Sequence, residues 1–318
     1  MSTLVIDGNH LAHRCRNVFS LSNRGVDVSV TYGFLRVLSS LLSKWKPTSV
    51  IVCWDGGIPN YRRVAIPEYK ANRHQDEDPF EYEEFLRQIR DLSDYVLPMM
   101  GVVVVRKVGV EADDLIAHAS QLLYGKVIII TSDKDMLQCV NDNVSMYNPN
   151  KEILYTPDVI EKEYGIPVNK LLDWRALQGD GSDNIPGVHG IGEKTASKLI
   201  QEFGDISGVY NAAMKRNPKG KLQDKIATSI VSFGWDRLVK NIYVSALYAD
   251  RTGSRAIIID KVNNYQPCNK ERVKKYLLKN AFMSLIETSF VGQLGKLNAP
   301  VLIQGLRTPV VCAKRVSV

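Results

Sequence analysis

The chain has 318 residues, of which 45% are hydrophobic and 24% charged, and its formal net charge of +7 gives a pI near 9.0. This length can bury one large core or two smaller ones, and the basic excess favours a polyanion such as nucleic acid as the partner. Five scattered cysteines with no C-x-x-C pair argue against a disulfide framework and a zinc site, and for a reducing compartment.

The N-terminus, MSTLVIDGNH, lacks the basic start and long apolar region of a signal peptide. No apolar run approaches the roughly 20 residues that a membrane helix needs. We therefore expect a soluble, cytoplasmic protein without a membrane partner. We also expect it to be monomeric.

The first half of the chain alternates two patterns. Runs rich in Val and Ile, typical of buried strands, occupy residues 3–7, 49–57, 101–109, 126–133 and 144–149. Amphipathic stretches at helical spacing lie between them, at 30–45 and 79–100. Strands separated by helices predict a mostly parallel sheet that is covered on both faces.

Acidic residues follow every one of the first four predicted strands. Ligand sites of open α/β sheets lie beyond the carboxyl ends of the strands, so these side chains should share one edge. A single such acid is more simply a turn residue or a helix cap, but seven together would repel one another strongly without cations. The seven are Asp7, Asp55, Glu111, Asp113, Asp114, Asp133 and Asp135.

The ion that this cluster predicts is Mg²⁺ or Mn²⁺, because the ligands are all carboxylate oxygens. Two other sites are excluded by their missing motifs: there is no G-x-G-x-x-G after the first strand and no P-loop. Divalent ions held by carboxylates suit phosphodiester hydrolysis, where they activate the attacking water and stabilise the leaving oxygen.

A basic segment, NYRRVAIPEYKANRH, follows the second predicted strand at residues 60–74. Its cations could grip a phosphate or a single strand, and its tyrosines could stack on unpaired bases. A solvated surface loop is an equally good interpretation of the charge alone. The basic residues are Arg62, Arg63, Lys70 and Arg73, interleaved with Tyr61 and Tyr69.

From about Tyr164 onward the strand pattern fades and helical periodicity takes over. The stretch LQGDGSDNIPGVHGIGEKTASKLI carries Asp180 and Asp183, which would complete the acid cluster. A glycine-punctuated hairpin and a helix start follow, a combination that binds a nucleic-acid backbone without reading its sequence. A plain glycine-capped hairpin is the simpler alternative. The residues concerned are Gly187, Gly190, Gly192, Lys194 and Thr195.

Six motifs occur together in this chain: VIDGNHLAHR, VCWDGG, IPEYKANR, GVEADDLIA, ITSDKDMLQ and LQGDGSDNIPGVHGIGEKTA. In this order they resemble the 5′ nuclease family, which comprises phage 5′-exonucleases, the 5′-nuclease domain of bacterial DNA polymerase I, and flap endonucleases. The resemblance covers about residues 1–290.

The resemblance implies an α/β fold with a PIN-like, mostly parallel sheet flanked by helices in residues 1–170. It implies a helical arch at about 60–95 and a C-terminal helical DNA-binding domain with a helix-hairpin-helix (helix-three-turn-helix) motif at 171–290. The tail, 291–318, stays unassigned.

The resemblance also implies roles for single residues. Two Mg²⁺ or Mn²⁺ ions would be bound, the first by Asp7, Asp55, Glu111, Asp113, Asp114 and Asp133, and the second by Asp133, Asp135, Asp180 and Asp183. Lys70 and Arg73 would contact the scissile phosphate, Arg14 would assist there, and Tyr69 would stack on a displaced base. Main-chain carbonyls would bind K⁺ at Leu177, Gln178, Pro186, Val188 and Ile191.

The implied activity is that of a 5′-3′ exonuclease and flap endonuclease, acting in replication or repair on 5′ ends and flaps of branched or duplex DNA. RNA primers annealed to DNA are a further expected substrate, and replication proteins are expected partners. Two alternatives remain. A non-catalytic branched-DNA-binding relative would lack some of the acids, and none is missing. A PIN-type ribonuclease would lack the helical second half.

Overall fold

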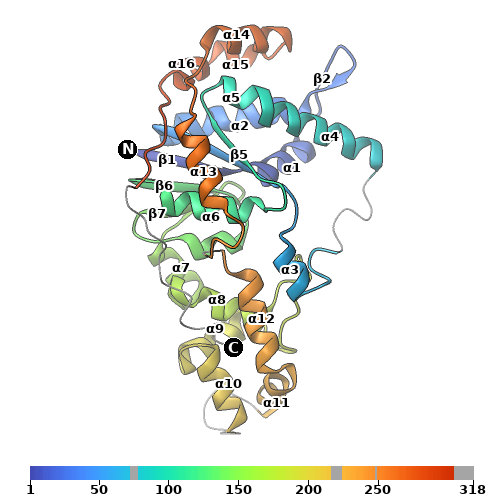
Figure 1. Ribbon diagram of the computed structural model, residues 1–318, viewed down its shortest axis with the longest axis vertical. Helices are drawn as coiled ribbons and strands as arrows, with labels where there is room; N and C mark the ends of the chain where they lie inside the picture. Colours follow the sequence, from blue (N-terminus) through green and yellow to red (C-terminus); the bar gives the residue numbers. More distant parts are fainter. Residues whose placement is uncertain (72–77, 216–223, 248, 304–318) are drawn as a thin grey trace.

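The computed structural model describes residues 1–71, 78–215, 224–247 and 249–303. A sheet in the order β5-β4-β1-β6-β7-β8 forms the centre of its wider part (Figure 1). All neighbouring strands pair in parallel except β7 and β8. The strands are β1 (Ser2–Asp7), β4 (Ser49–Trp54), β5 (Val103–Arg106), β6 (Lys126–Ile130), β7 (Val144–Asn148) and β8 (Ile153–Tyr155). The five predicted strands are confirmed. Strand β8 was not predicted, because its three residues are too few to show an alternating pattern of apolar and polar side chains.

Side chains of the central strands alternate between two apolar cores. Val5 packs with Ile51 and Val103 on one face of the sheet. Leu4 and Ile6, its neighbours in β1, belong to the core on the other face. Both faces are buried, which is why these strands read as continuous apolar runs.

Helices cover both faces. The face with Leu4 is covered by α1 (Gly8–Val18), α2 (Ser29–Trp45), α4 (Pro79–Asp91), the π-helical turn η1 (Leu92–Val96) and α5 (Leu97–Met99). The face with Val5 is covered by α6 (Ala112–Leu122) and α13 (Ser254–Asn263). A small hairpin of β2 (Ser22–Asn23) and β3 (Val26–Asp27) joins α1 to α2.

A narrower helical part extends away from the sheet (Figure 1). Its elements are α7 (Pro157–Tyr164), η3 (Val168–Lys170), α8 (Leu171–Gln178), α9 (Glu193–Phe203), α10 (Ile206–Met214), α11 (Asp224–Phe233) and α12 (Trp235–Ser245). It joins the sheet through η2 (Lys134–Cys139), which follows β6 and packs against α8, and through α3 (Asn60–Ala65), which packs against α12. Among the described residues, no helix has the length and apolarity to cross a bilayer.

The last helices return to the sheet domain instead of extending the helical part. They are α14 (Lys270–Lys279), α15 (Met283–Glu287) and α16 (Phe290–Leu294), at the top of Figure 1. Helices α15 and α16 pack against α2, and α14 packs on α15 and α16. Leu277 and Phe282 share a core with Phe34 of α2, and α13 packs on α6 and β5. The range 171–290, expected as one helical domain, therefore does not pack as one body.

Part of the expected tail is also ordered against the sheet domain. The Asn298 N–H donates to the Thr48 carbonyl at 2.8 Å, and Leu302 forms a bridge with Leu123. Residues 291–303 thus close one end of the sheet domain, whereas residues 304–318 lie outside the described residues.

Two adjacent leucines of α14 test this packing. Leu277 is fully buried and Leu278 is 58% exposed. We expect Leu277→Ala to lower the free energy of unfolding by about 2–5 kcal/mol, because it leaves a cavity in the core that α14 shares with the sheet domain. Leu278→Ala, the matched control, should change it by less than about 0.5 kcal/mol. Urea unfolding measures both, and equal losses would contradict the placement of α14.

Candidate metal centre

The carboxyl ends of three adjacent strands bring acids to one edge of the sheet. Asp7 is the last residue of β1, Asp55 directly follows β4, and Asp133 lies three residues beyond β6. Asp113 joins them from the first turn of α6. The arrangement follows from the parallel order β4-β1-β6, because parallel strands end at the same edge.

These acids carry more negative charge than their surroundings neutralise. Burial, together with the charges of Asp55 and Asp133, raises the pKa of Asp7 to about 7. Burial raises the pKa of Asp113 well above its usual value, and Asp133 again adds to the effect. Carboxylates that hold protons near neutral pH lack a cation, so the electrostatics favour binding of one.

Some of these acids also act as helix caps or accept local hydrogen bonds, as expected for single acids after a strand. One oxygen of Asp55 accepts the Ala112 N–H at 2.7 Å, at the start of α6. Asp7 accepts the His10 N–H and the Thr131 hydroxyl, each at 3.0 Å. These bonds fix the carboxylates in orientation, so capping and a metal-binding role are compatible here.

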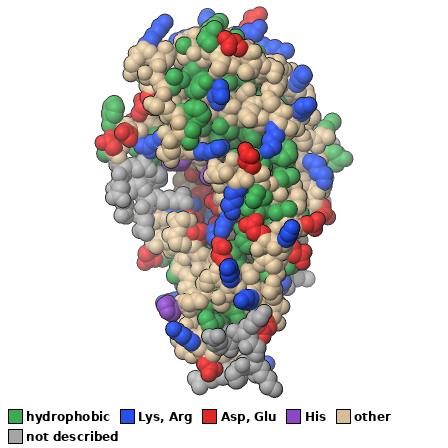
Figure 2. Space-filling view, turned by 180° about the vertical axis from the view of Figure 1, so that it is seen from behind, with side chains coloured by type: hydrophobic (Ala, Val, Ile, Leu, Met, Phe, Trp, Pro, Cys, Tyr) green, Lys and Arg blue, Asp and Glu red, His purple; other side chains and the backbone are tan. Residues whose placement is uncertain are grey.

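A second acidic group combines Asp135 of η2 with two acids of the hairpin between α8 and α9. Oxygens of Asp135, Asp180 and Asp183 all lie within 4.8 Å of one another. Paired backbone bonds of 2.8 Å between Asp180 and Ile185 fold this turn. Burial and the charge of Asp133 together raise the pKa of Asp135 to about 7. Asp133 thus lies between the two acidic groups, and acidic side chains are visible in a hollow on this face (Figure 2).

Arg175, on α8, is a site residue that the sequence reasoning missed. Its Nη2 contacts both Asp135 and Asp180. Burial disfavours the charge of Asp180, but Arg175 and the hydrogen bonds from Ser182 and the Asp183 N–H together hold the pKa of that carboxyl below its usual value. The only feature of the sequence that could have indicated its role is that it is a cation on the helix directly before the acidic hairpin. Arg175 also borders a recess of about 350 Å³, lined by His10, Ser132, Asp133, Lys134, Arg175, Asp180 and Ser182.

The expectation that Arg62 binds DNA needs correction. Its side chain is 2% exposed, so it does not face a DNA strand. Its Nη1 and Nη2 donate to the two oxygens of Asp114 at 2.6 and 3.0 Å, it also binds Glu111, and its Nε donates to the Val244 carbonyl at 2.9 Å. Through these contacts Arg62 fixes α3 to α6 and α12. Its two acidic partners, Glu111 and Asp114, stay predicted metal ligands.

Tyr69 and Lys70 of the basic segment also turn inward. Lys70 Nζ binds Glu111 and lies 3.5 Å from Asp183 Oδ2, and the Lys70 N–H donates to the Asp183 carbonyl at 3.0 Å. Lys70 adopts a left-handed φ of 55°, which is costly for a residue with a Cβ. The Tyr69 hydroxyl donates to Asp183 at 3.1 Å, and the residue is 5% exposed. The expected stacking of Tyr69 on a base does not fit this position.

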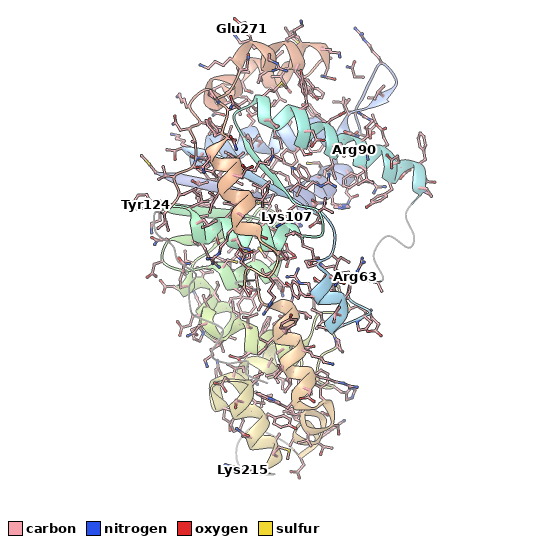
Figure 3. The ribbon with its side chains drawn as sticks, viewed as in Figure 1. Arg63, Arg90, Lys107, Tyr124, Lys215 and Glu271 are labelled. Carbon is pink, nitrogen blue, oxygen red and sulfur yellow. The ribbon has the colours of Figure 1, made fainter. Side chains whose placement is uncertain are left out.

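The other predicted cations have different surroundings. Arg63 is exposed on α3 (Figure 3). Arg14 is partly exposed on α1, one turn after His10, so it shares the helix face that borders the recess. Arg73 lies outside the described residues, as do residues 72–77 of the expected arch.

Close packing and backbone conformation each account for a glycine in the hairpin. A Cβ on Gly187 would come within 1.9 Å of the Gln178 carbonyl oxygen, so this glycine serves the packing of the hairpin itself. Gly190 has a left-handed φ of 80°. Gly192 is the N-cap of α9 and faces open space, and Lys194 is exposed next to it with Thr195 in the same turn. This half of the hairpin can receive an anion.

The expected potassium ligands are partly engaged within the chain. The carbonyl of Leu177 accepts the Val188 N–H at 2.8 Å, and that of Val188 accepts the Ile191 N–H at 3.0 Å. The carbonyl of Pro186 accepts the Asn241 side chain at 2.7 Å.

Comparison with known families identifies both parts of the chain. Residues 2–165 match the model described as 5′-3′ exonuclease, N-terminal resolvase-like domain, and residues 166–243 match 5′-3′ exonuclease, C-terminal SAM fold. A 5′-3′ exonuclease of Bacillus subtilis is 34% identical over 255 residues, which are 76% of this chain and 83% of that protein. DNA polymerase I of Mycobacterium bovis is 36% identical over 241 residues, or 72% of this chain. The chain spans about a quarter, 26%, of that polymerase.

Solved structures show the same fold at lower identity. A phage T5 5′-exonuclease with bound zinc has a TM-score of 0.64 and 23% identity, covering 88% of this chain and 100% of that one. The catalytic core of Rad2 in complex with DNA has a TM-score of 0.59 and 18% identity, with 87% of each chain covered.

The buried pairs of Arg62 predict a large effect on stability. We expect Arg62→Ala to lower the free energy of unfolding by about 3–5 kcal/mol, because it leaves Glu111 and Asp114 buried without their partner. The neighbouring Arg63→Ala removes an exposed charge and should cost less than about 0.5 kcal/mol. Urea unfolding of both variants distinguishes them. A mild effect at Arg62 would contradict the ion pairs.

The raised pKa values predict how stability depends on pH without metal. The pKa of Asp7 and of Asp135 is about 7 in the folded chain, against 3.8 ordinarily. Between these values the folded state binds more protons, so stability is present at low pH and is lost as pH rises toward 7. We expect the free energy of unfolding in EDTA to fall by roughly 2–4 kcal/mol from pH 5 to pH 8. Asp135→Asn should reduce the slope. A flat or rising profile would contradict the cluster's uncompensated charge.

Proposed function

Because the chain belongs to the 5′-3′ exonuclease family, we propose that it is a metal-dependent nuclease that cleaves phosphodiesters at 5′ ends and 5′ flaps of DNA. The observation that carries the proposal is the meeting of two acidic groups, one from the strand ends and one from the α8–α9 hairpin. Without bound cations these carboxylates would repel the DNA phosphates as well as one another, so the site needs metal ions to bind DNA.

The donor set fits two hard divalent ions, Mg²⁺ or Mn²⁺, because every carboxylate offers oxygen. In this proposal Asp7, Asp55, Asp113 and Asp133 hold one ion, and Asp133, Asp135, Asp180 and Asp183 hold the other. Such ions supply an activated water and stabilise the leaving oxygen in phosphodiester hydrolysis. Glu111 and Asp114, which also pair with Lys70 and Arg62, stay predicted ligands of the first ion.

The chain's own cations would position the DNA. Lys70 already points into the acid cluster, so its ammonium would contact the scissile phosphate once the acids are neutralised. Arg14 and Arg73 would add charge around that phosphate. Gly192, Lys194 and Thr195 would hold a backbone phosphate at the start of α9, away from the cut.

The preferred substrates in this proposal are 5′-ended and branched DNA duplexes, including RNA primers annealed to DNA. K⁺ at the hairpin, a monomeric state and a cytoplasmic location belong to the same proposal. The alternative, a non-catalytic DNA-binding relative, is less well supported, because Asp135, Asp180 and Asp183 are all present and close together.

Cleavage of a 5′-labelled flap duplex tests the proposal. With Mg²⁺ we expect short labelled oligonucleotides from flap cleavage, or mononucleotides if exonuclease action dominates. EDTA should abolish both products. Asp135→Asn should lower the rate by ~100-fold or more, because it removes charge stabilisation at the reacting phosphate.

Asp158→Asn is the matched control, since Asp158 is an exposed acid on α7, outside the cluster. It should retain the wild-type rate. DNA binding by the wild-type protein without any product in Mg²⁺ or Mn²⁺ would reject the nuclease and favour the binding protein.

A further inference from the structure

The guanidinium of Arg175 occupies the position where the proposed second ion needs its ligands. Its Nη2 contacts Asp135 and Asp180, two of the three residues whose oxygens approach within 4.8 Å of one another. An ion there would need those oxygens at about 2.0–2.6 Å. Guanidinium and ion therefore compete for the same two carboxylates.

We propose that Arg175 closes the second metal site of this chain, and that a DNA phosphate opens it by drawing the guanidinium away. The inference rests on the proposed function for the identity of the site. It makes Arg175 a positioning residue that couples entry of the second ion to the arrival of DNA.

Deprotonation cannot relieve this competition, because arginine stays charged in proteins. The side chain therefore has to move, or the divalent ion binds weakly beside a like charge. Phosphate is a suitable acceptor for the displaced group, since guanidinium and phosphate form paired, charge-assisted hydrogen bonds.

The few contacts of Arg175 allow its side chain to move away from the carboxylates. Nη2 alone makes both carboxylate contacts, and its buried Nε has no hydrogen-bond partner among the residues described. The side chain is 14% exposed and borders the 350 Å³ recess, which offers room for movement.

Arg62, in the same site, shows what a fixed arginine looks like in this protein. All three of its nitrogens donate hydrogen bonds, to Asp114, Glu111 and the Val244 carbonyl, and it is 2% exposed. Each contact would have to break before Arg62 moved. Arg175 has two contacts to exchange, and both of its partners are proposed metal ligands.

Mn²⁺ binding without DNA tests the inference and needs no cleavage. Free Mn²⁺ is measured by electron paramagnetic resonance during titration of the full chain at pH 7.5. We expect the wild-type protein to bind one ion tightly and one weakly. Arg175→Gln should tighten the weak site about tenfold or more, a normal size for coupling between two sites.

Lys170→Gln is the matched control, because Lys170 precedes the same helix and pairs with Asp205, outside the cluster. It should leave both affinities unchanged. Unchanged or weaker binding in Arg175→Gln would overturn the inference, since Arg175 would then be a passive or supporting partner of the carboxylates. A wild-type chain that binds no Mn²⁺ would instead reject the proposed function.

The coupling to DNA is tested by repeating the titration with a 5′-phosphorylated duplex, whose integrity is checked on a gel. The duplex should tighten the weak site more in the wild-type protein than in Arg175→Gln. Equal tightening in both would overturn the role of the phosphate.

Arg175→Gln could fail to fold without metal, because it leaves the acids unneutralised. The rise of the melting temperature with Mn²⁺ is then compared between Arg175→Lys and the wild-type protein. Lysine is a point charge without the planar fork of arginine, so the rise should be larger in the variant. An equal rise would overturn the inference.

Discussion

Repulsion between carboxylates at one edge of the sheet is the constraint to which the rest of the site responds. The parallel order of β4, β1 and β6 brings Asp55, Asp7 and Asp133 together, and the α8–α9 hairpin adds Asp180 and Asp183. Such a group persists only if its charge is neutralised or protonated. The structure does both: Asp7 and Asp135 have raised pKa values, while arginines and a lysine neutralise other members.

The neutralising cations divide into a fixed and an exchangeable kind. Arg62 is buried and fully hydrogen-bonded, so it ties α3 to α6 and α12 and holds the two halves of the molecule together. Lys70 and Arg175 are the exchangeable kind, because they contact Asp183 and Asp180, which we propose as metal ligands. The same acidic edge thus binds the cation that docks the helical part, and it is the site where we propose that a divalent ion replaces a side-chain cation.

The sheet and the positions of the acids at its edge could be predicted from the sequence, because both follow from local patterns of residues. Strands buried on both faces read as apolar runs, and Asp7, Asp55 and Asp133 stand at their ends. The partners of the cations were not predictable in this way. Arg62 lies 52 residues from Asp114, and its RR pair with Arg63 gives no sign that one is buried and the other exposed. The return of α14–α16 to α2 is similarly long-range, because an amphipathic helix indicates that it packs, not where.

Anomalous diffraction from crystals grown with Mn²⁺ and DNA would show whether the acid cluster binds two ions. We expect two manganese peaks in the cluster, one beside Asp7 and Asp133 and one among Asp135, Asp180 and Asp183, with Arg175 turned away from Asp135. Crystals with DNA bound but no manganese at these carboxylates would contradict this expectation.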